Sequence, residues 1–269
     1  MAEKLYAQTS PDGREVIRQN MKDLRNAWEL VSETLQSSLN KLDNCLLQFA
    51  EFSLSQEQLT KWLKNIEHAM QQHTETKATL QEKKAQLQNH IVINQEILSH
   101  QNLVQSVCDK AQELVNQTKD NTLNTYLESI KNLYEKIVTK SKELMNSLEL
   151  SVQNHSEFNQ VCQKLKLILK EQRDKIREND SIAAEKDNIV KKLNIFKEMK
   201  TINTTENELR NHLGEVFQLV SKTTTKKGIN VMSKEISRID SDKSQLIIQL
   251  DTIIEKMEEI LIQWTDFEN

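Results

Sequence analysis

Histidine and cysteine are the residues of this chain that could coordinate a metal ion or act as nucleophiles. The six histidines are His68, His73, His90, His100, His155 and His212, and the three cysteines are Cys45, Cys108 and Cys162. A helical metal site prefers ligands four residues apart, and zinc sites use CxxC or Cys/His spacings; neither pattern occurs. We therefore expect no metal site, and we expect the histidines to be solvated or at the edge of the apolar seam. The widely separated cysteines indicate a reducing compartment.

Other catalytic patterns are also missing from the sequence. It has no glycine-rich phosphate loop, its cysteines have no paired base nearby in the sequence, and Glu258 and Glu259 are typical of a solvated helix face. We expect no enzyme activity and no bound cofactor. One histidine differs from the others, because His155 occupies an apolar position shortly before Phe158. Either a polar neighbour satisfies it, or it loosens the packing there.

Composition predicts a chain that is almost entirely helical. The 269 residues include only 3 glycines and 1 proline, far below the ordinary usage of about 7% and 5%. The net charge of −4 comes from 36 basic and 40 acidic residues that are interspersed along the chain, so no nucleic-acid footprint is visible. Because no run of about 18 apolar residues occurs, we expect no membrane contact in this segment.

An internal repeat relates three parts of the chain. Residues 52–70 carry apolar side chains at every third or fourth position, as one face of a helix does. A shift of 106 positions lays this segment on residues 158–176 and places Phe52 on Phe158. A further shift of 109 gives a third copy of the last helix, with Gly228 at its start. The sequence therefore predicts a unit of about 106 residues.

Polar clusters predict the turns inside each unit. They lie at residues 8–13, 73–79, 116–122, 179–185 and 222–228. Two turns divide each unit into three helices of about 20, 35 and 35 residues. No turn signal occurs at Phe52 or Phe158, so the last helix of one unit should continue into the next. We predict the end of a preceding unit at 1–51 and two further units at 52–157 and 158–269.

The unit resembles the spectrin repeat, because Trp62 is central in its first helix and Trp28 or Tyr134 in its third. Residues 23–35, DLRNAWELVSETL, are similar to the middle of that family's third helix. The resemblance covers the whole chain. It implies an all-α fold of tandem three-helix repeats that form an elongated rod with continuous inter-repeat helices.

Aromatic residues at the spacing of the apolar seam are expected in the core. The predicted core aromatics are Trp28, Trp62, Tyr134, Trp264, Phe52 and Phe158. Two positions depart from the family pattern: Ile168 replaces the tryptophan of the first helix, and Lys243 replaces the aromatic residue of the third. Residues 201–207 also interrupt the apolar periodicity, which indicates either a frayed helix or a surface for a partner.

Spectrin-type repeats imply a giant cytoskeletal linker, and the Asn-, Gln- and Ser-rich outer faces are most similar to nesprins. The resemblance implies a rod segment that serves as mechanical spacer and protein-docking surface in nucleus-to-actin coupling. Its expected location is the cytoplasmic face, with attachment to the outer nuclear membrane through other parts of the protein. An actin regulator such as a formin, or a motor adaptor, is the implied partner.

Three other functions fit parts of the pattern. One is a spectraplakin- or dystrophin-type rod at the cell cortex. Another is an intermolecular coiled-coil tether or scaffold, but turns spaced to fold the chain back on itself favour a monomer. The third is a membrane-remodelling helical domain, which would require basic faces that the evenly mixed charge does not provide.

Overall fold

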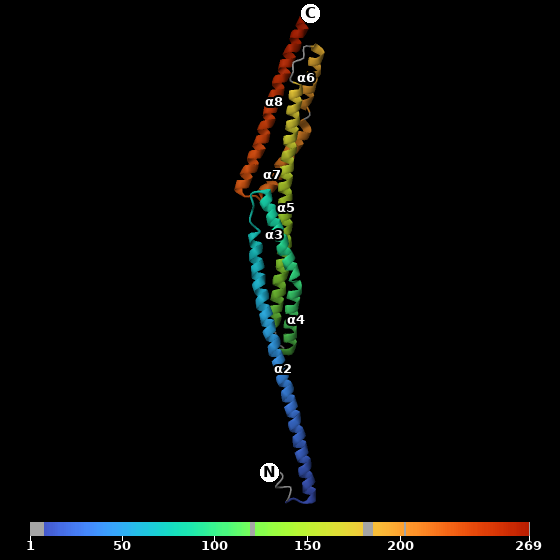
Figure 1. Cartoon of the computed structure of the whole chain (residues 1–269), viewed down its shortest axis with the longest axis vertical. Helices are drawn as coiled ribbons and strands as arrows, with labels where there is room; N and C mark the ends of the chain where they lie inside the picture. Colours follow the sequence, from blue (N-terminus) through green and yellow to red (C-terminus); the bar gives the residue numbers. More distant parts are fainter. Residues whose placement is uncertain (1–7, 119–121, 180–184, 202, 269) are drawn as a thin grey trace. The chain divides into compact units, whose positions relative to one another are not determined.

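The computed structural model of the chain describes residues 8–118, 122–179, 185–201 and 203–268. These residues form seven α-helices, and the predicted all-α fold is confirmed (Figure 1). The helices are α2 (Pro11–Gln72), α3 (Leu80–Ser99), α4 (Gln101–Thr118), α5 (Thr122–Asn179), α6 (Lys186–Thr201), α7 (Asn203–Ser221) and α8 (Lys226–Glu268). None of them, over the described residues, has an apolar stretch long enough to cross a bilayer.

The helix ends follow the predicted turns closely. The turn at residues 73–79 separates α2 from α3, and the turn before α8 is shorter than predicted because α8 already begins at Lys226. Gly228 therefore lies inside a helix. A Cβ atom there would lie 2.5 Å from the carbonyl oxygen of Ala78, so glycine permits the close approach of α8 to the turn before α3. The predicted turns at 116–122 and 179–185 lie partly outside the described residues.

Helix continuity is confirmed at both predicted repeat boundaries. Helix α2 runs through Phe52 for 62 residues, and α5 runs through Phe158 for 58 residues. The prediction of one uninterrupted middle helix is wrong, because α3 ends at Ser99 and α4 begins at Gln101. His100 occupies the break, where its ring stacks on Trp62 with centroids 4.0 Å apart and planes 4° from parallel.

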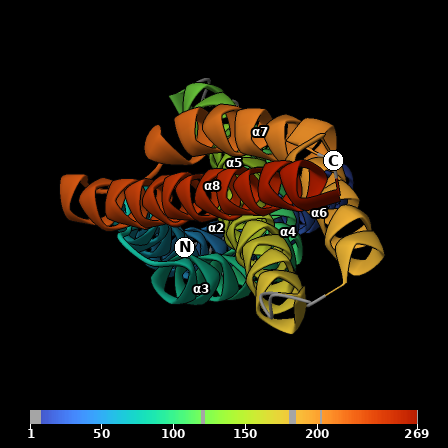
Figure 2. The same ribbon diagram turned by 90° about the horizontal axis from the view of Figure 1, so that it is seen from above.

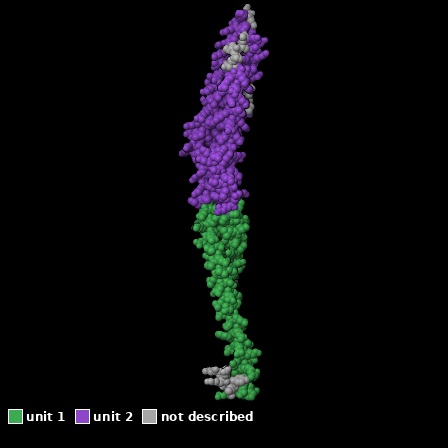
Figure 3. All heavy atoms as spheres, in the orientation of Figure 1, with its two compact units in different colours: residues 1–66, 98–137 green, residues 67–97, 138–269 purple. Residues whose placement is uncertain are grey.

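The chain divides into two compact units (Figure 3). Unit 1 comprises residues 1–66 and 98–137, and unit 2 comprises residues 67–97 and 138–269. This division follows spatial contacts, whereas the boundaries at 52 and 158 follow sequence similarity. The three predicted repeat ranges therefore stay a prediction.

The core of unit 1 is made of three helical segments. Its buried apolar residues are Phe52, Leu59, Leu63 and Ile66 from α2, Val104, Val107, Cys108, Ala111 and Leu114 from α4, and Leu127, Ile130, Tyr134 and Ile137 from α5. Their spacing of three and four residues is that of helices packed along one seam. Residues 18–37 of α2 are exposed throughout, because no described helix packs beside them.

Unit 2 contains two hydrophobic clusters where α6 and α7 both lie along α8 (Figures 1 and 2). The first cluster consists of Phe158, Val161, Cys162, Leu165 and Leu169 from α5, Leu213, Val216 and Val220 from α7, and Met232, Ile236 and Ile239 from α8. The second cluster consists of Ile176 from α5, Ile189, Leu193, Phe196 and Met199 from α6, and Leu246, Leu250, Ile254 and Met257 from α8. No buried residue belongs to both clusters.

Candidate functional site: a buried polar junction

Two turns of unit 2 that are far apart in the sequence contact each other. Lys77, in the turn before α3, forms an isolated parallel bridge with Thr224, in the turn before α8. The backbone N–H of Thr225 donates to the carbonyl oxygen of Lys77 at 3.4 Å. Gly228 lies against Ala78 in the same contact. The backbone thus joins the start of α3 to the start of α8.

The first turn of α3 positions a buried lysine in this contact. Thr79 and Glu82 form a capping box, in which the N–H of Glu82 donates to Thr79 Oγ1 at 3.2 Å and the N–H of Thr79 donates to Glu82 Oε2 at 2.9 Å. The next residue, Lys83, is only 2% exposed. Its Nζ donates to Thr223 Oγ1 at 3.0 Å and to Thr224 Oγ1 at 2.9 Å.

The hydroxyl groups around Lys83 provide acceptors for its charge. The hydroxyls of Thr223 and Thr224 donate to the carbonyl oxygen of Val220, which leaves their oxygens free to accept from Lys83. Ser151 of α5 donates to Thr223 Oγ1 at 2.9 Å. Burial lowers the pKa of Lys83 to about 8, and no carboxylate of the described residues lies within ion-pair distance of its Nζ. We call Lys83, Ser151, Thr223 and Thr224 the polar junction.

His155 of α5 lies close to the polar junction. It is 5% exposed, and its Nδ1 has no hydrogen-bond partner among the described residues. Burial and the nearby positive charge of Lys83 lower the pKa of His155 to about 4. The ring is therefore neutral at pH 7. The sequence left two alternatives for His155: a polar neighbour that satisfies it, or looser packing around it. The described residues supply no polar partner for Nδ1, and the ring is nevertheless buried in unit 2.

A second polar chain continues along α3. His90 is fully buried, and its Nε2 lies 2.9 Å from the carbonyl oxygen of Ser141. Because a carbonyl only accepts, Nε2 carries the proton and Nδ1 of His90 accepts from Nδ1 of His73 at 3.3 Å. Burial, His90 and Lys77 lower the pKa of His73. The prediction of solvated or seam-edge histidines is wrong for His90, because Ser141 and His73 satisfy both ring nitrogens.

The arrangement links three elements of unit 2 through hydrogen bonds. The polar junction joins α3, α5 and the turn before α8 through groups that are costly to bury without partners. It therefore fixes one relative position of these three elements. Among the described residues, no three potential ligands form a group that could hold a metal ion.

The six predicted core aromatics differ from one another in how deeply they are buried. Phe52, Tyr134 and Phe158 are buried, and Trp62 is partly buried under His100. Trp264 is also partly buried; it packs against the second cluster of unit 2 and contacts the edge of Phe267. Trp28 is 71% exposed, because its part of α2 has no described helix beside it. Trp28 therefore contacts none of the other five predicted core aromatics.

Sequence reasoning missed the polar junction. The buried residues of α3 are Lys83, Gln86, His90 and Ile97, which lie at seam spacing although the first three are polar. A search for polar residues at heptad positions could have found them. Thr224 lies in the predicted turn at 222–228, yet its side chain is buried and accepts from Lys83.

Known proteins similar to this chain are long linkers. No family model matches the chain. It is 44% identical over 266 residues to Muscle-specific protein 300 kDa of Drosophila melanogaster, covering 99% of this chain and 2% of that protein. It is 20% identical over 265 residues to Microtubule-actin cross-linking factor 1 of Rattus norvegicus, covering 97% of this chain and 5% of that protein.

A third relative points to the same class. The chain is 22% identical over 171 residues to human Nesprin-3, covering 63% of this chain and 18% of that protein. The chain therefore spans only a small part of each of these three relatives. They are structural cytoskeletal linkers, and together with the all-helical fold they support the resemblance found in the sequence. The chain is similar to segments of giant cytoskeletal linkers, consistent with a spectrin-repeat rod of the nesprin or spectraplakin type.

Proposed function

We propose that this chain is a non-enzymatic rod segment of a nesprin-like linker, in which it acts as mechanical spacer and protein-docking surface between nucleus and actin. The polar junction is the observation that carries this proposal. On the predicted division into repeats, Lys83 belongs to the repeat at 52–157, and Thr223 and Thr224 belong to the repeat at 158–269. The junction would then join two neighbouring repeats besides the continuous helix α5.

Such a second connection changes how a pulled chain responds. A rod of repeats is stabilised by each repeat and by its nearest-neighbour interfaces. With α5 as the only connection, one repeat could unfold without disturbing the next. The hydrogen bonds of Lys83 to Thr223 and Thr224 link the stabilities of both, so unfolding of one repeat should weaken its neighbour.

Single-molecule pulling of the whole chain tests this coupling. Lys83→Met removes the three N–H donors and keeps most of the apolar stem, and Lys84→Met changes the exposed neighbouring lysine as a matched control. We expect linked unfolding of the two repeats in the wild type and in Lys84→Met, and independent unfolding events in Lys83→Met. Independent events in all three chains would contradict a junction that couples repeats.

The first part of α2 fits the end of a preceding repeat, as proposed for residues 1–51. Its apolar seam is exposed at Met21, Leu24, Val31, Leu35 and Leu42, and it continues without interruption into the buried seam that starts at Phe52. Helices of a preceding repeat would cover these residues in a longer chain. An N-terminally extended chain should then shift the fluorescence of Trp28 to the blue, and an unchanged spectrum would contradict this assignment.

The proposed location and partners rest on the relatives. Attachment to the outer nuclear membrane through other parts of the protein is supported by the similarity to Nesprin-3. Docking of an actin regulator such as a formin, or of a motor adaptor, is supported by the linker class alone. The similarity to Microtubule-actin cross-linking factor 1 favours a spectraplakin-type rod at the cortex as the second candidate.

The molar mass of the chain in solution distinguishes the monomeric rod from an intermolecular coiled-coil tether. Light scattering over a concentration series should give a constant mass near 31.4 kDa for a chain folded on itself. A doubled mass that rises with concentration would favour the tether and would contradict the monomeric rod.

A further inference from the structure

The two hydrophobic clusters of unit 2 are separated along its helices by positions with polar or charged side chains. The first cluster ends at Leu169 on α5, begins at Leu213 on α7 and ends at Ile239 on α8. The second cluster resumes at Ile176 on α5 and Leu246 on α8. Between these limits lie Gln172 on α5 and Lys243 on α8, and on α7 Glu206 precedes Leu209, which packs against the first cluster.

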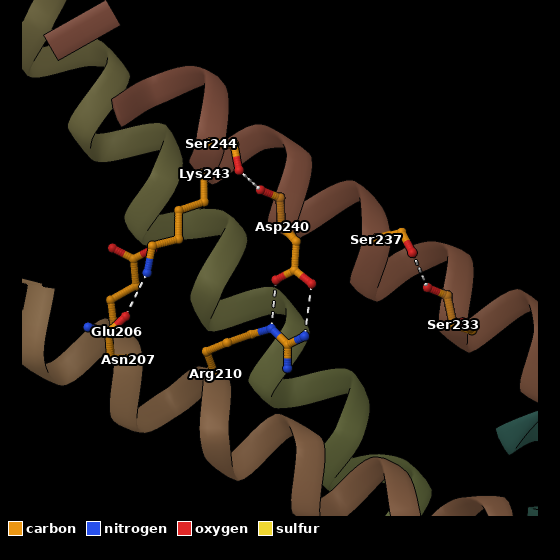
Figure 4. A network of polar contacts seen from close by, with 8 residues as sticks. All are labelled: Glu206, Asn207, Arg210, Ser233, Ser237, Asp240, Lys243 and Ser244. Carbon is orange, nitrogen blue, oxygen red and sulfur yellow. Dashed lines mark hydrogen bonds and ion pairs between the residues drawn. The ribbon is translucent and has the colours of Figure 1, made fainter. Parts of the chain in front are cut away.

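A partly buried ion pair lies between the clusters on α7 and α8 (Figure 4). Glu206 of α7 is 4% exposed, and its Oε1 lies 3.3 Å from Nζ of Lys243 on α8. The same Nζ donates to Oδ1 of Asn207 at 2.8 Å. On α5, Gln172 lies between the two clusters, and its buried Oε1 has no hydrogen-bond partner among the described residues. We call Glu206, Asn207 and Lys243 the polar layer.

The polar layer explains two irregularities of the sequence together. Lys243 replaces the aromatic residue of the third helix, and Glu206 and Asn207 belong to the stretch that interrupts the apolar periodicity. The two departures face each other across α7 and α8 (Figure 4). The second departure therefore compensates the first, and the pair keeps a charged group in the seam.

A charged clamp borders the polar layer on the side of the first cluster. Arg210 binds Asp240 with both arms, Nε to Oδ1 at 2.6 Å and Nη2 to Oδ2 at 2.8 Å (Figure 4). This contact lowers the pKa of Asp240 and raises that of Arg210. The clamp fastens α7 to α8 at the end of the first cluster, next to Leu213 and Ile239.

The physical consequence is a weak plane across unit 2. Apolar packing transmits stability only between residues in contact, and a buried ion pair adds little because the desolvation of its charges offsets their attraction. The second cluster can therefore lose its packing without exposing the apolar residues of the first cluster. The clamp and the polar junction both lie with the first cluster.

We propose that the polar layer is a break point at which the far half of unit 2 opens as one body. That half comprises α6, α5 from Ile176 onward and α8 from Leu246 onward. The first cluster, the clamp and the polar junction stay folded when it opens. This device goes beyond the spacer role, because it lets the segment lengthen under load while the connection between repeats is kept.

Hydrogen exchange of the whole chain at low urea tests the break point. We expect the amides of α6 and of residues 246–257 to share one opening reaction, and to exchange about tenfold or more faster than amides of residues 158–169, 213–220 and 232–239. Equal opening free energies for both groups of amides would overturn the proposal.

A double substitution provides the second arm of the test. Glu206→Leu with Lys243→Leu replaces the ion pair by apolar side chains and should join the two clusters, so both groups of amides should exchange together. The matched control is Glu208→Leu with Lys234→Leu, two exposed residues on the same helices, which should leave the difference unchanged. A difference that survives the first pair of substitutions contradicts the role of the polar layer. If that variant fails to fold, the exchange of the wild type alone decides.

Discussion

The two units bury different chemistry. Every buried polar or charged residue of the described chain lies in unit 2, namely Lys83, Gln86, His90, Ser141, Ser151, His155, Glu206 and Thr224. Unit 1 fills the corresponding space with apolar and aromatic side chains. Helical seam spacing occurs in both units, so the difference lies in the residue types at seam positions: on our proposals, these decide where the fold is coupled and where it can open.

One set of equivalent positions makes the contrast concrete. In unit 1 the rings of Trp62 and His100 stack, and Tyr134 is buried in the same unit. The shifts of 106 and 109 positions place Ile168, Glu206 and Lys243 at the same points of unit 2. At these equivalent positions, a tryptophan, a histidine and a tyrosine of unit 1 are thus replaced by an isoleucine and an ion pair in unit 2.

The largest expected effect comes from removing the aromatic side of this comparison. Tyr134→Ala deletes a buried ring and leaves a cavity in unit 1, which should lower the free energy of unfolding by about 4 kcal/mol. Urea denaturation followed by circular dichroism measures the change. A loss below about 1 kcal/mol would mean that the ring contributes little packing, and that the aromatic positions of unit 1 are not the more stabilising ones.

Breaking the ion pair between Glu206 and Lys243 should lower the free energy of unfolding by less than removing Tyr134 does. Lys243→Ala leaves the carboxylate of Glu206 buried without its cation, and we expect a loss of about 2 kcal/mol, reduced from the full cost of a broken buried pair because Lys243 reaches solvent. Lys234→Ala, on the exposed side of α8, is the control. An unchanged urea midpoint would show that water replaces Lys243 freely.

Acid should destabilise unit 2 selectively. The pKa of His155 is about 4 in the folded chain and near 6.5 in the unfolded one, so the unfolded state takes up the proton first. The contribution of His155 to stability should therefore be complete above pH 6.5 and be lost as the pH decreases from 6.5 to 4. The lowered pKa of His73 acts in the same direction.

His155→Phe separates this effect from general acid denaturation. Phenylalanine occupies the equivalent position 49 of the first copy, so the variant should keep its packing and lose much of the dependence between pH 6.5 and 4. Urea midpoints at several pH values measure it. An identical pH profile for wild type and variant would show that His155 is not the responsive group.

The smallest effect is expected at Trp28. Because this side chain is exposed, Trp28→Ala should change the free energy of unfolding of the chain by less than about 0.5 kcal/mol. A larger loss, especially one that depends on protein concentration, would show that a second copy covers the exposed seam of α2.

Much of the fold could be predicted because its causes are local. The scarcity of glycine and proline, the apolar spacing and the polar turns determine helices and their ends, and the repeat locates the continuous helices at Phe52 and Phe158. The break at His100 could not be predicted, since its ring stacks on Trp62 of another helix. Turn residues alone give no sign of that contact.

The candidate site was less predictable because its partners are far apart. Lys83 and Thr224 are separated by 141 residues, and neither is unusual in its own helix or turn. Lys243 and residues 201–207 both departed visibly from the pattern, yet their pairing depends on the register of α7 against α8. A polar residue at a seam position shows that a partner is needed and does not say which one.

A double-mutant cycle on Lys83 and Thr224 tests the central claim, that the polar junction couples the start of α3 to the turn before α8. Lys83→Met, Thr224→Val and the double variant are compared by urea unfolding of the whole chain, with Lys84→Met replacing Lys83→Met in a control cycle. We predict a coupling energy of about 1 kcal/mol or more for the first cycle and additivity for the control. Additivity within about 0.3 kcal/mol in both cycles would contradict the account.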